Sequence, residues 1–396
     1  MDHGDQHFDP SSARPIDRNS SLTQVNVALL NWKDPAALDA GGAERYVKEI
    51  ADSWSSAGHD VIVVVPQSGQ RPDADGSQGR YLHLGNRRTV FPLARAWLRS
   101  AERDLDLVIE SVSTRPFFSH RIVGRRAVAL YHQMADDVWD HEVSFPLSWA
   151  GRYIIEPHWV RGMRGSRIVA VSRSTAADLA RYGVTVEAIN PPGCVPVNAA
   201  IHDRPPGPPR LVFAGRLVKA KRPMDALQAF EALQRTEPAA TLDIIGDGYL
   251  RVLLTDRARR GVTVHGFVSE ELKNHILSRA DLLLLPGTRE GWGIVALEAA
   301  MHGVPAVAYN VPGLRDAVVD NVTGCLCDAT PSAMARTAET LLRTPARLIA
   351  MSAAARHHAL EYSWEKVASR LWGICADNAA SPRRQAAREG TSQSKI

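Results

Sequence analysis

The sequence predicts an α/β protein made of two doubly wound domains, each built on a parallel sheet. Short runs of Val, Ile and Leu alternate along the chain with longer segments of helical periodicity. The short runs are almost continuously apolar, which is typical of strands buried on both faces of a parallel sheet. The alternation breaks once, at residues 189–210, where proline and glycine are too dense for a regular element. We therefore expect one domain on each side of this break.

Ten strand-like runs support this prediction, five before the break and five after it. Helical spacing follows most of them, most clearly over residues 43–58, where Gly58 suits the left-handed position that ends many helices. Repeated strand–helix units form doubly wound sheets, in which ligands bind beyond the carboxyl ends of the strands. Functional residues should therefore follow strands. The predicted strands are residues 25–30, 61–65, 105–111, 127–132, 167–172, 210–215, 242–246, 262–266, 281–286 and 305–310.

The same patterns divide the chain into tails, domains and a linker. The polar, aperiodic residues 1–20 and 379–396 are predicted to be disordered tails. The first domain is expected over residues 21–195 and the second over 210–360, with the linker between them at 196–209. Two domains of similar size that face each other leave a central cleft, which is the expected place for a ligand.

Composition and charge exclude several classes of protein. The chain has 396 residues, of which 45% are hydrophobic, and its formal net charge is +4. So small a charge, without a run rich in Lys and Arg, argues against a nucleic-acid partner. Arginines nevertheless recur in the first half of the chain. They either form an ordinary solvated surface or attract an anionic acceptor or membrane face. These arginines are Arg121, Arg125, Arg126, Arg161, Arg164 and Arg167.

Cysteines and apolar stretches indicate a cytoplasmic protein. The four cysteines have no zinc-ligand spacing and are too few for a disulfide-rich secreted protein. Residues 1–20 lack the apolar core of a secretory signal, and no apolar stretch reaches the ~20 residues that cross a bilayer. We therefore expect no transmembrane segment, and contact with a membrane surface stays open.

Two carboxylates flank a candidate anion site in the stretch REGWGIVALEAA, residues 289–300. A predicted strand ends just before it, and a helix should begin near Ile294, so the amides of residues 291–293 lie at a helix N-terminus that attracts anions. Glu290 stands in the loop and Glu298 about two turns further on. Together they suit a ligand with hydroxyls on both sides of a diphosphate, such as a nucleotide sugar. Equally, Glu290 could cap the helix and Glu298 could pair with an arginine.

A second motif, FAGRLVKAKRP at residues 213–223, places two cations just after a predicted strand. Gly215 turns the chain, and Arg216 and Lys221 follow it. Both cations can contact one diphosphate and stabilise it as it leaves. A solvated basic loop is the alternative interpretation.

Three weaker features also follow strands. Gly246 and Gly248 in IIGDG let a loop approach a ligand or form an ordinary tight turn. The pair at residues 41–42 begins a helix and either covers a ligand or simply starts that helix. His132 ends a predicted strand, where a histidine faces the ligand or serves the fold. By contrast, the Asp-x-Asp pattern at residues 104–106 precedes a strand, so we interpret it as solvated acids rather than a metal motif.

Taken together, these motifs resemble the family 4 retaining glycosyltransferases of GT-B fold, over nearly the whole chain between the tails. The resemblance rests on the Glu-x7-Glu pattern of REGWGIVALEA, on FAGRLVKAKRP, IIGDG, INPPGC and GVPAVAYNVPGLRDAV, and near the front on NWKDP…GGAE and YHQMADDVW. It implies two Rossmann-like domains facing a central cleft, with a last helix, at residues 361–378, that crosses back onto the first domain.

The resemblance also implies an activity. A sugar would pass with retention, and without a metal or other cofactor, from a nucleoside-diphosphate sugar to a hydroxyl of a small-molecule, glycan or lipid acceptor. Two rival functions stay open. One is a sugar phosphorylase or synthase on the same fold, and the other is a non-catalytic protein that binds sugar nucleotides.

The resemblance assigns roles residue by residue. Glu290 would hold the donor-sugar hydroxyls and Glu298 the ribose hydroxyls. Arg216 and Lys221 would neutralise the diphosphate, and His132 would stabilise positive charge at the anomeric carbon. Trp292 departs from the family, which often has Phe there. Further donor contacts, many through the backbone, are expected at Gly41, Gly42, Gly215, Gly246, Gly266, Phe267, Gly291, Trp292, Gly293 and Ile294.

Overall fold

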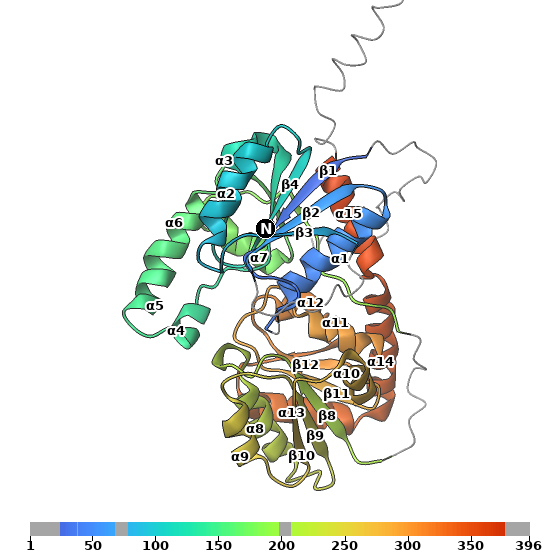
Figure 1. Cartoon of the computed structure of the whole chain (residues 1–396). Helices are drawn as coiled ribbons and strands as arrows, with labels where there is room; N and C mark the ends of the chain where they lie inside the picture. Colours follow the sequence, from blue (N-terminus) through green and yellow to red (C-terminus); the bar gives the residue numbers. More distant parts are fainter. Residues whose placement is uncertain (1–23, 38, 68–77, 198–206, 377–396) are drawn as a thin grey trace, which may run out of the picture.

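The computed structural model describes residues 24–37, 39–67, 78–197 and 207–376, and it contains two parallel sheets (Figure 1). The first has the strand order β3-β2-β1-β4-β5-β6-β7 and the second β10-β9-β8-β11-β12-β13. The predicted doubly wound α/β architecture is therefore confirmed. The first sheet comprises β1 (Asn26–Leu30), β2 (Asp60–Val65), β3 (Arg80–His83), β4 (Leu107–Val112), β5 (Ala127–Tyr131), β6 (Arg167–Ala170) and β7 (Ala188–Ile189). The second comprises β8 (Arg210–Ala214), β9 (Thr241–Ile245), β10 (Val262–Gly266), β11 (Leu282–Leu285), β12 (Ala306–Tyr309) and β13 (Gly324–Cys327).

All ten predicted strands are present, and three strands were not predicted. Those three, β3, β7 and β13, each lie at an edge of a sheet. An edge strand pairs on one side only, so its sequence need not be a continuous apolar run. β3, with the sequence RYLH, has no fully buried residue, and β7 has only two residues. Hydrophobic runs therefore predicted every central strand, which is enclosed on every side, and one edge strand, β10.

Helices cover both faces of the first sheet. On one face Trp54 of α1 packs against Trp372 of α15, with ring centroids 5.1 Å apart, and on the other Phe91 of α2 packs against Phe117. The predicted stop after α1 is confirmed, since Gly58 has a positive φ of 92°. The first-domain helices are α1 (Gly42–Ser56), α2 (Val90–Ala101), α3 (His120–Val123), η2 (Gly124–Arg126), α4 (Val138–Glu142), α5 (Leu147–Ala150), η3 (Gly151–Ile155), α6 (Glu156–Arg161) and α7 (Arg173–Ala180).

The second sheet is also covered on both faces. One core cluster joins it to α11 and α14, and another joins it to α8 and α13. The helices of this half are η4 (Lys219–Lys221), α8 (Pro223–Leu233), α9 (Arg251–Arg257), α10 (Glu270–Leu277), α11 (Ile294–Met301), α12 (Leu314–Ala317), α13 (Pro331–Leu342), α14 (Pro345–Leu360) and α15 (Trp364–Ala376).

The last helix, α15, crosses back to the first domain, as the family resemblance implied (Figure 1). Val367 and Leu371 are fully buried in the core that also contains α1, and the Trp54 indole donates a hydrogen bond to the Ala368 carbonyl at 3.1 Å. The proline-rich break is tied to the same corner, since Cys194 donates its amide to the Tyr362 carbonyl at 2.8 Å. The predicted tails and residues 198–206 of the predicted linker lie outside the described residues.

The Asp-x-Asp pattern lies at the amino ends of the strands. Asp106 accepts a hydrogen bond from the Asn26 amide at 2.9 Å, and the Asn26 side chain donates to the Asp104 carbonyl at 2.8 Å. The Asp106 carboxylate and the Asp104 backbone therefore fasten the entry of β1, at the end of the sheet opposite the ligand side. In the part of the chain that the structure describes, no helix is both long and apolar enough to span a bilayer.

Candidate active site

The loop between β11 and α11 lies against the first domain. A Cβ atom added at Gly291 would stand 2.5 Å from the His132 carbonyl oxygen, so no side chain fits at this position. Gly293 begins α11 with a positive φ of 97°. In the second sheet the strand order reverses between β8 and β11, and open α/β sheets bind ligands at such a switch point. The loop thus occupies the ligand side of the second sheet and touches the corresponding side of the first.

Three of the four residues predicted to be catalytic meet around Gly291. Lys221, at the end of η4, contacts Glu290 directly through Nζ and Oε1. Both side chains are largely enclosed, at 21% and 17% exposure. His132 stands across the domain interface, at the carboxyl end of β5. The fourth residue, Arg216, follows β8, is exposed, and makes no salt bridge within the described part of the chain.

His132 is buried and uncharged. Its Nε2 lies 3.0 Å from the Ser111 hydroxyl, and its ring meets the Tyr46 ring edge-on at 5.6 Å. Burial lowers the pKa of the His132 imidazole from its ordinary 6.5 to about 3. The ring is therefore neutral at physiological pH. A neutral ring does not oppose positive charge that develops on a nearby carbon.

Glu298 is ion-paired in the structure. Its Oε1 contacts Arg45 Nη1 on α1 of the first domain and lies 3.1 Å from Lys273 Nζ on α10. The arginine pair that the sequence left open for Glu298 is thus present, while its proposed contact with ribose stays a prediction. Both cations use Oε1, and Oε2 has no hydrogen bond within the described residues.

The candidate glycines lie where backbones approach most closely. Gly215 and Gly246 follow adjacent strands, and a Cβ at Gly246 would stand 1.8 Å from the Gly215 carbonyl oxygen. The Gly246 amide donates to the Gly266 carbonyl at 2.8 Å, which brings in a third strand end. A loop this close to its neighbours tolerates only glycine, so packing alone accounts for Gly246.

Two helix N-termini converge from opposite domains. Gly41 caps α1, and a Cβ at Gly42 would stand 2.8 Å from Cδ1 of Ile294, the first residue of α11. The N-termini of α1 and α11 therefore lie next to each other, and the positive ends of both helix dipoles would stabilise an anion bound between them.

Two of the predicted donor-binding residues are aromatic, and their exposure to solvent differs greatly. Phe267 is 73% exposed, and Trp292 is 7% exposed and packs against Tyr362, with ring centroids 5.7 Å apart. The Trp292 ring thus lies in the core, and only its backbone can face a ligand.

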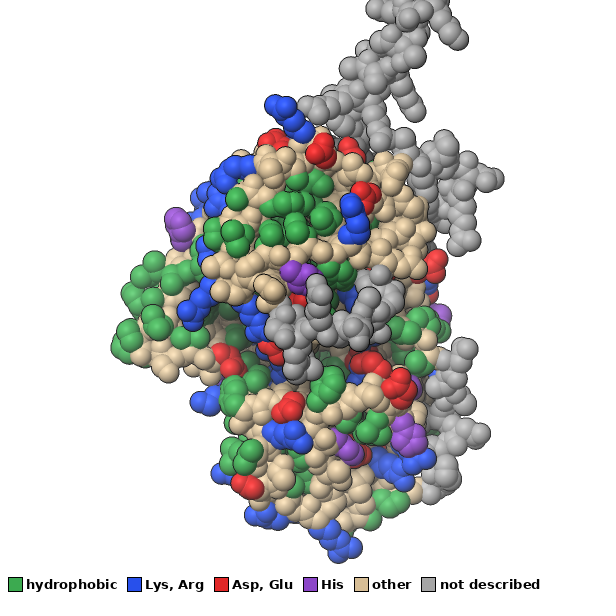
Figure 2. Space-filling model, in the orientation of Figure 1, with side chains coloured by type: hydrophobic (Ala, Val, Ile, Leu, Met, Phe, Trp, Pro, Cys, Tyr) green, Lys and Arg blue, Asp and Glu red, His purple; other side chains and the backbone are tan. Residues whose placement is uncertain are grey.

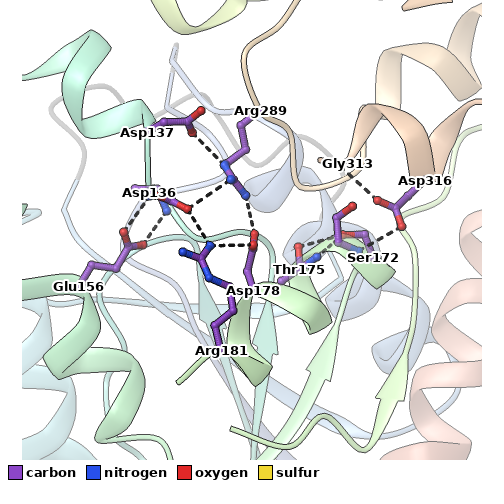
Figure 3. Close-up of polar contacts among 12 residues, drawn as sticks. Asp136, Asp137, Glu156, Ser172, Thr175, Asp178, Arg181, Arg289, Gly313 and Asp316 are labelled. Carbon is purple, nitrogen blue, oxygen red and sulfur yellow. Dashed lines mark hydrogen bonds and ion pairs between the residues drawn. The ribbon is translucent and has the colours of Figure 1, made fainter. Parts of the chain in front are cut away.

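A cluster that sequence reasoning missed joins the domains beside this loop. Arg289 is 9% exposed and is enclosed by three aspartates of the first domain, as Figure 3 shows. Its Nε lies 2.9 Å from Asp137, its Nη2 lies 3.3 Å from Asp136, and its Nη1 contacts Asp178. We call these four residues the arginine clasp. The clasp holds the residue just before Glu290, so it positions the loop that carries the site.

Other polar contacts reinforce the same interface. Glu142 of α4 accepts from the Ala220 amide at 2.9 Å and from the Tyr249 hydroxyl at 2.9 Å. The Ser174 amide donates to Asp316 at 3.2 Å. Glu142 thus places a carboxylate against the backbone between Arg216 and Lys221.

Two family models match the chain, one on each side of the proline-rich break. The model described as Glycosyltransferase Family 4 matches residues 40–192, and the model described as Glycosyl transferases group 1 matches residues 196–358. The D-inositol 3-phosphate glycosyltransferase of Xylanimonas cellulosilytica is 31% identical over an alignment of 428 residues, which covers 94% of this chain and 100% of that protein. The chain belongs to the group 1 glycosyltransferases of family 4.

Further similar proteins agree with this glycosyltransferase assignment. Glycogen synthase of Mycobacterium tuberculosis is 28% identical, over 87% of this chain and 93% of its own length. Among solved structures, sucrose-phosphate synthase from Thermosynechococcus elongatus superposes with a TM-score of 0.73 at 18% identity, covering 90% of this chain and 100% of that one. The solved structure supports the fold alone. The predicted family, enzyme class and GT-B fold are therefore confirmed.

The arginine clasp makes the glycosyltransferase sensitive to one substitution. Arg289→Ala removes the cation that Asp136, Asp137 and Asp178 share. Arg181 still pairs with Asp136 and Asp178, and Arg152 with Asp136, so the cost should lie at the lower end of the about 3–5 kcal/mol of a broken buried ion pair. Arg343→Ala is the matched control, because Arg343, just after α13, is 58% exposed and among the described residues its salt bridge is with Glu339, one turn earlier. Such a surface pair is worth about 0–1 kcal/mol. Urea unfolding of both variants checks the prediction, and equal losses of stability would contradict it.

The neutral state of His132 predicts a pH dependence of stability. Since its pKa is about 3 in the folded enzyme and 6.5 ordinarily, only the unfolded chain binds a proton here between those values. Stability therefore falls as pH drops below about 6.5, by about 2 kcal/mol at pH ~5. His132→Gln removes this contribution.

Unfolding free energies of the enzyme and of His132→Gln, at pH ~7 and pH ~5, test the prediction. The enzyme should lose about 2 kcal/mol more than the variant on acidification. The same loss in both proteins would mean that His132 titrates near its ordinary pKa.

Proposed function

We propose that this glycosyltransferase moves a sugar, with retention and without a metal, from a nucleoside-diphosphate sugar to an acceptor hydroxyl. One observation carries the proposal. Lys221 and Glu290 contact each other at the switch point of the second sheet, beside the place where the N-termini of α1 and α11 converge. A cation and two helix N-termini suit the negative charge of a diphosphate, and a carboxylate suits the hydroxyls of the attached sugar.

The diphosphate would be held from both domains. Lys221 and Arg216 follow β8, and the amides of residues 291–293 point from the start of α11. The start of α1 adds the first domain's contribution. Because the Ala220 amide already donates a hydrogen bond to the Glu142 carboxylate, the backbone of this loop is suited to an anionic oxygen.

The two glutamates would hold hydroxyls at either end of the diphosphate. Oε2 of Glu298 is the acceptor available for ribose hydroxyls, while Arg45 and Lys273 keep the carboxylate in place through Oε1. Glu290, oriented by Lys221, would accept from hydroxyls of the sugar. The pair therefore fixes the donor at both ends while the bond between them breaks.

The transfer itself would be a front-face displacement. The acceptor hydroxyl attacks the anomeric carbon on the face from which the diphosphate leaves, and the C–O bond to the diphosphate breaks with its electron pair going to the phosphate oxygen. That oxygen takes the hydroxyl proton. Arg216 and Lys221 stabilise the negative charge that grows there, and the neutral ring of His132 lies beside the positive charge on the sugar.

A metal-independent reaction is part of the proposal, since Asp104 and Asp106 fasten the amino end of β1 rather than the site. A cytoplasmic location is also part of it, supported by four free cysteines. Activity that EDTA abolishes and manganese restores would overturn the metal-free mechanism. Donor cleavage that requires inorganic phosphate would favour a phosphorylase instead.

Lys221→Ala should lower turnover more than donor affinity. In the ground state several groups bind the diphosphate together, so the loss of one of them weakens binding only in part. As the glycosidic bond breaks, extra negative charge appears on the leaving phosphate, and a cation directed at that phosphate stabilises it. Only an interaction that is stronger in the transition state than in the ground state speeds the chemical step. Loss of one preorganised donor of this kind costs about 100–1,000-fold in turnover. Calorimetry of donor binding beside single-turnover rates, with a saturating acceptor, checks this.

Lys219→Ala is the matched control, because Lys219 lies in the same short helix and its side chain is exposed. It should change neither quantity by more than about threefold. If Lys221→Ala lowers affinity and leaves the single-turnover rate unchanged, Lys221 only anchors the donor.

A further inference from the structure

The helical segment of residues 147–161, made of α5, η3 and α6 in direct succession, turns its apolar side outward. Leu147 is 67% exposed, Tyr153 57% and Ile154 54%, and Trp149 and Ile155 are exposed beside them. Helices of globular proteins ordinarily bury the apolar side and expose the polar one. We call this set, together with the exposed Phe145 that precedes it, the outward apolar face.

Polar contacts on the inner side fix this orientation. Glu156 is 2% exposed and accepts from the amides of Ala135 and Asp136 at 2.6 and 2.8 Å and from the Trp139 indole at 3.1 Å. Arg152 pairs with Asp136 at 3.1 Å. Turning the helices to bury the apolar face would strip a carboxylate of three hydrogen bonds, which is costly. Its exposure is therefore built into the fold.

Positive charge borders the outward apolar face. Residues 113–126 and 143–167 lie together, since Arg115 stands 5.9 Å from the Trp159 ring and Arg121 donates to the Gly162 carbonyl. Glu156 is the only acid in these two segments, and it is buried. The exposed acids of the preceding α4 are engaged, Asp140 by Arg152 and Glu142 by Ala220 and Tyr249. Figure 2 shows hydrophobic side chains gathered at this end of the first domain, with Lys and Arg side chains beside them. The exposed arginines are Arg115, Arg121, Arg125, Arg161 and Arg164.

The combination selects one kind of partner. The chain segments outside the described ranges are polar in sequence and offer no apolar stretch to cover the face. A second copy packed face to face would bring two sets of arginines together, and like charges oppose such contact. An anionic bilayer instead offers an apolar interior to aliphatic side chains, an interface that suits Trp and Tyr, and phosphates for arginine.

We propose that the outward apolar face docks this enzyme on the surface of an anionic lipid bilayer. Its aliphatic and aromatic side chains enter the boundary between head groups and acyl chains, and the bordering arginines contact lipid phosphates. The docking does not depend on the proposed sugar transfer. It places the site well, however, because α4 precedes this face and its Glu142 contacts Ala220, which lies between the proposed diphosphate ligands Arg216 and Lys221. An acceptor hydroxyl at the bilayer surface would then lie near the domain interface.

Vesicle flotation tests the docking with the full-length enzyme. Vesicles of phosphatidylcholine mixed with phosphatidylglycerol should bind it, and phosphatidylcholine alone should bind it more weakly by at least about tenfold, because each cation near an anionic surface contributes about 1 kcal/mol. Leu147→Ser combined with Ile154→Ser should lower binding to the mixed vesicles by at least about tenfold. Arg125→Glu with Arg161→Glu should do the same and should abolish the dependence on salt.

A matched control uses apolar side chains that are equally exposed elsewhere. Val252 and Ile349 of the second domain are 71% and 62% exposed, so Val252→Ser with Ile349→Ser should bind vesicles like the parent enzyme. Absence of vesicle binding, equal binding to both lipid mixtures, or equal losses in both Ser pairs would overturn the proposal. The enzyme could instead fail to bind vesicles and sediment as a dimer that Leu147→Ser with Ile154→Ser dissociates. That result would assign the face to a second copy of the chain.

Discussion

The ion pairs that Arg289 makes with three aspartates of the other domain are the constraint on which the rest of the site depends. A guanidinium stays charged in a protein, so one that is only 9% exposed is stable only where carboxylates surround it. The domains can therefore meet in few other ways without leaving charges buried and unpaired. Because Arg289 adjoins Glu290, the same contact sets where the donor loop lies. Domain orientation and site geometry follow from one cluster of charges.

Within that frame the site combines charges of both signs with one neutral ring. Lys221 orients Glu290, and Arg45 with Lys273 orients Glu298, so each carboxylate that should meet a hydroxyl is held by a cation. His132 stays uncharged because it is buried. The helix ends add positive potential without any side chain. Such preorganisation lets a site stabilise charge as it appears without first rearranging.

Much of this arrangement followed from the sequence, for a physical reason. Buried parallel strands are continuously apolar, so the central strands and the residues after them, including Lys221 and Glu290, could be located. The edge strand β3 could not, because one unpaired side relaxes its composition. The aspartates around Arg289 were missed too, and the arginine that pairs with Glu298 could not be identified. Asp178 is 111 residues from Arg289 in the sequence, and Arg45 is 253 residues from Glu298. Only the packing of the two domains brings these partners together.

The central claim is that the domain interface would bind a nucleoside diphosphate, with Glu298 on the ribose and with Arg216 and Lys221 on the diphosphate. Thermal unfolding with a series of nucleoside diphosphates, beside the matching nucleosides, tests this most directly. At 100 times its dissociation constant the right diphosphate should add about 2.7 kcal/mol of stability, the nucleoside alone much less, and Glu298→Gln should lose most of the gain. If no diphosphate stabilises the enzyme, or if Glu298→Gln responds as fully as the parent, the site lies elsewhere.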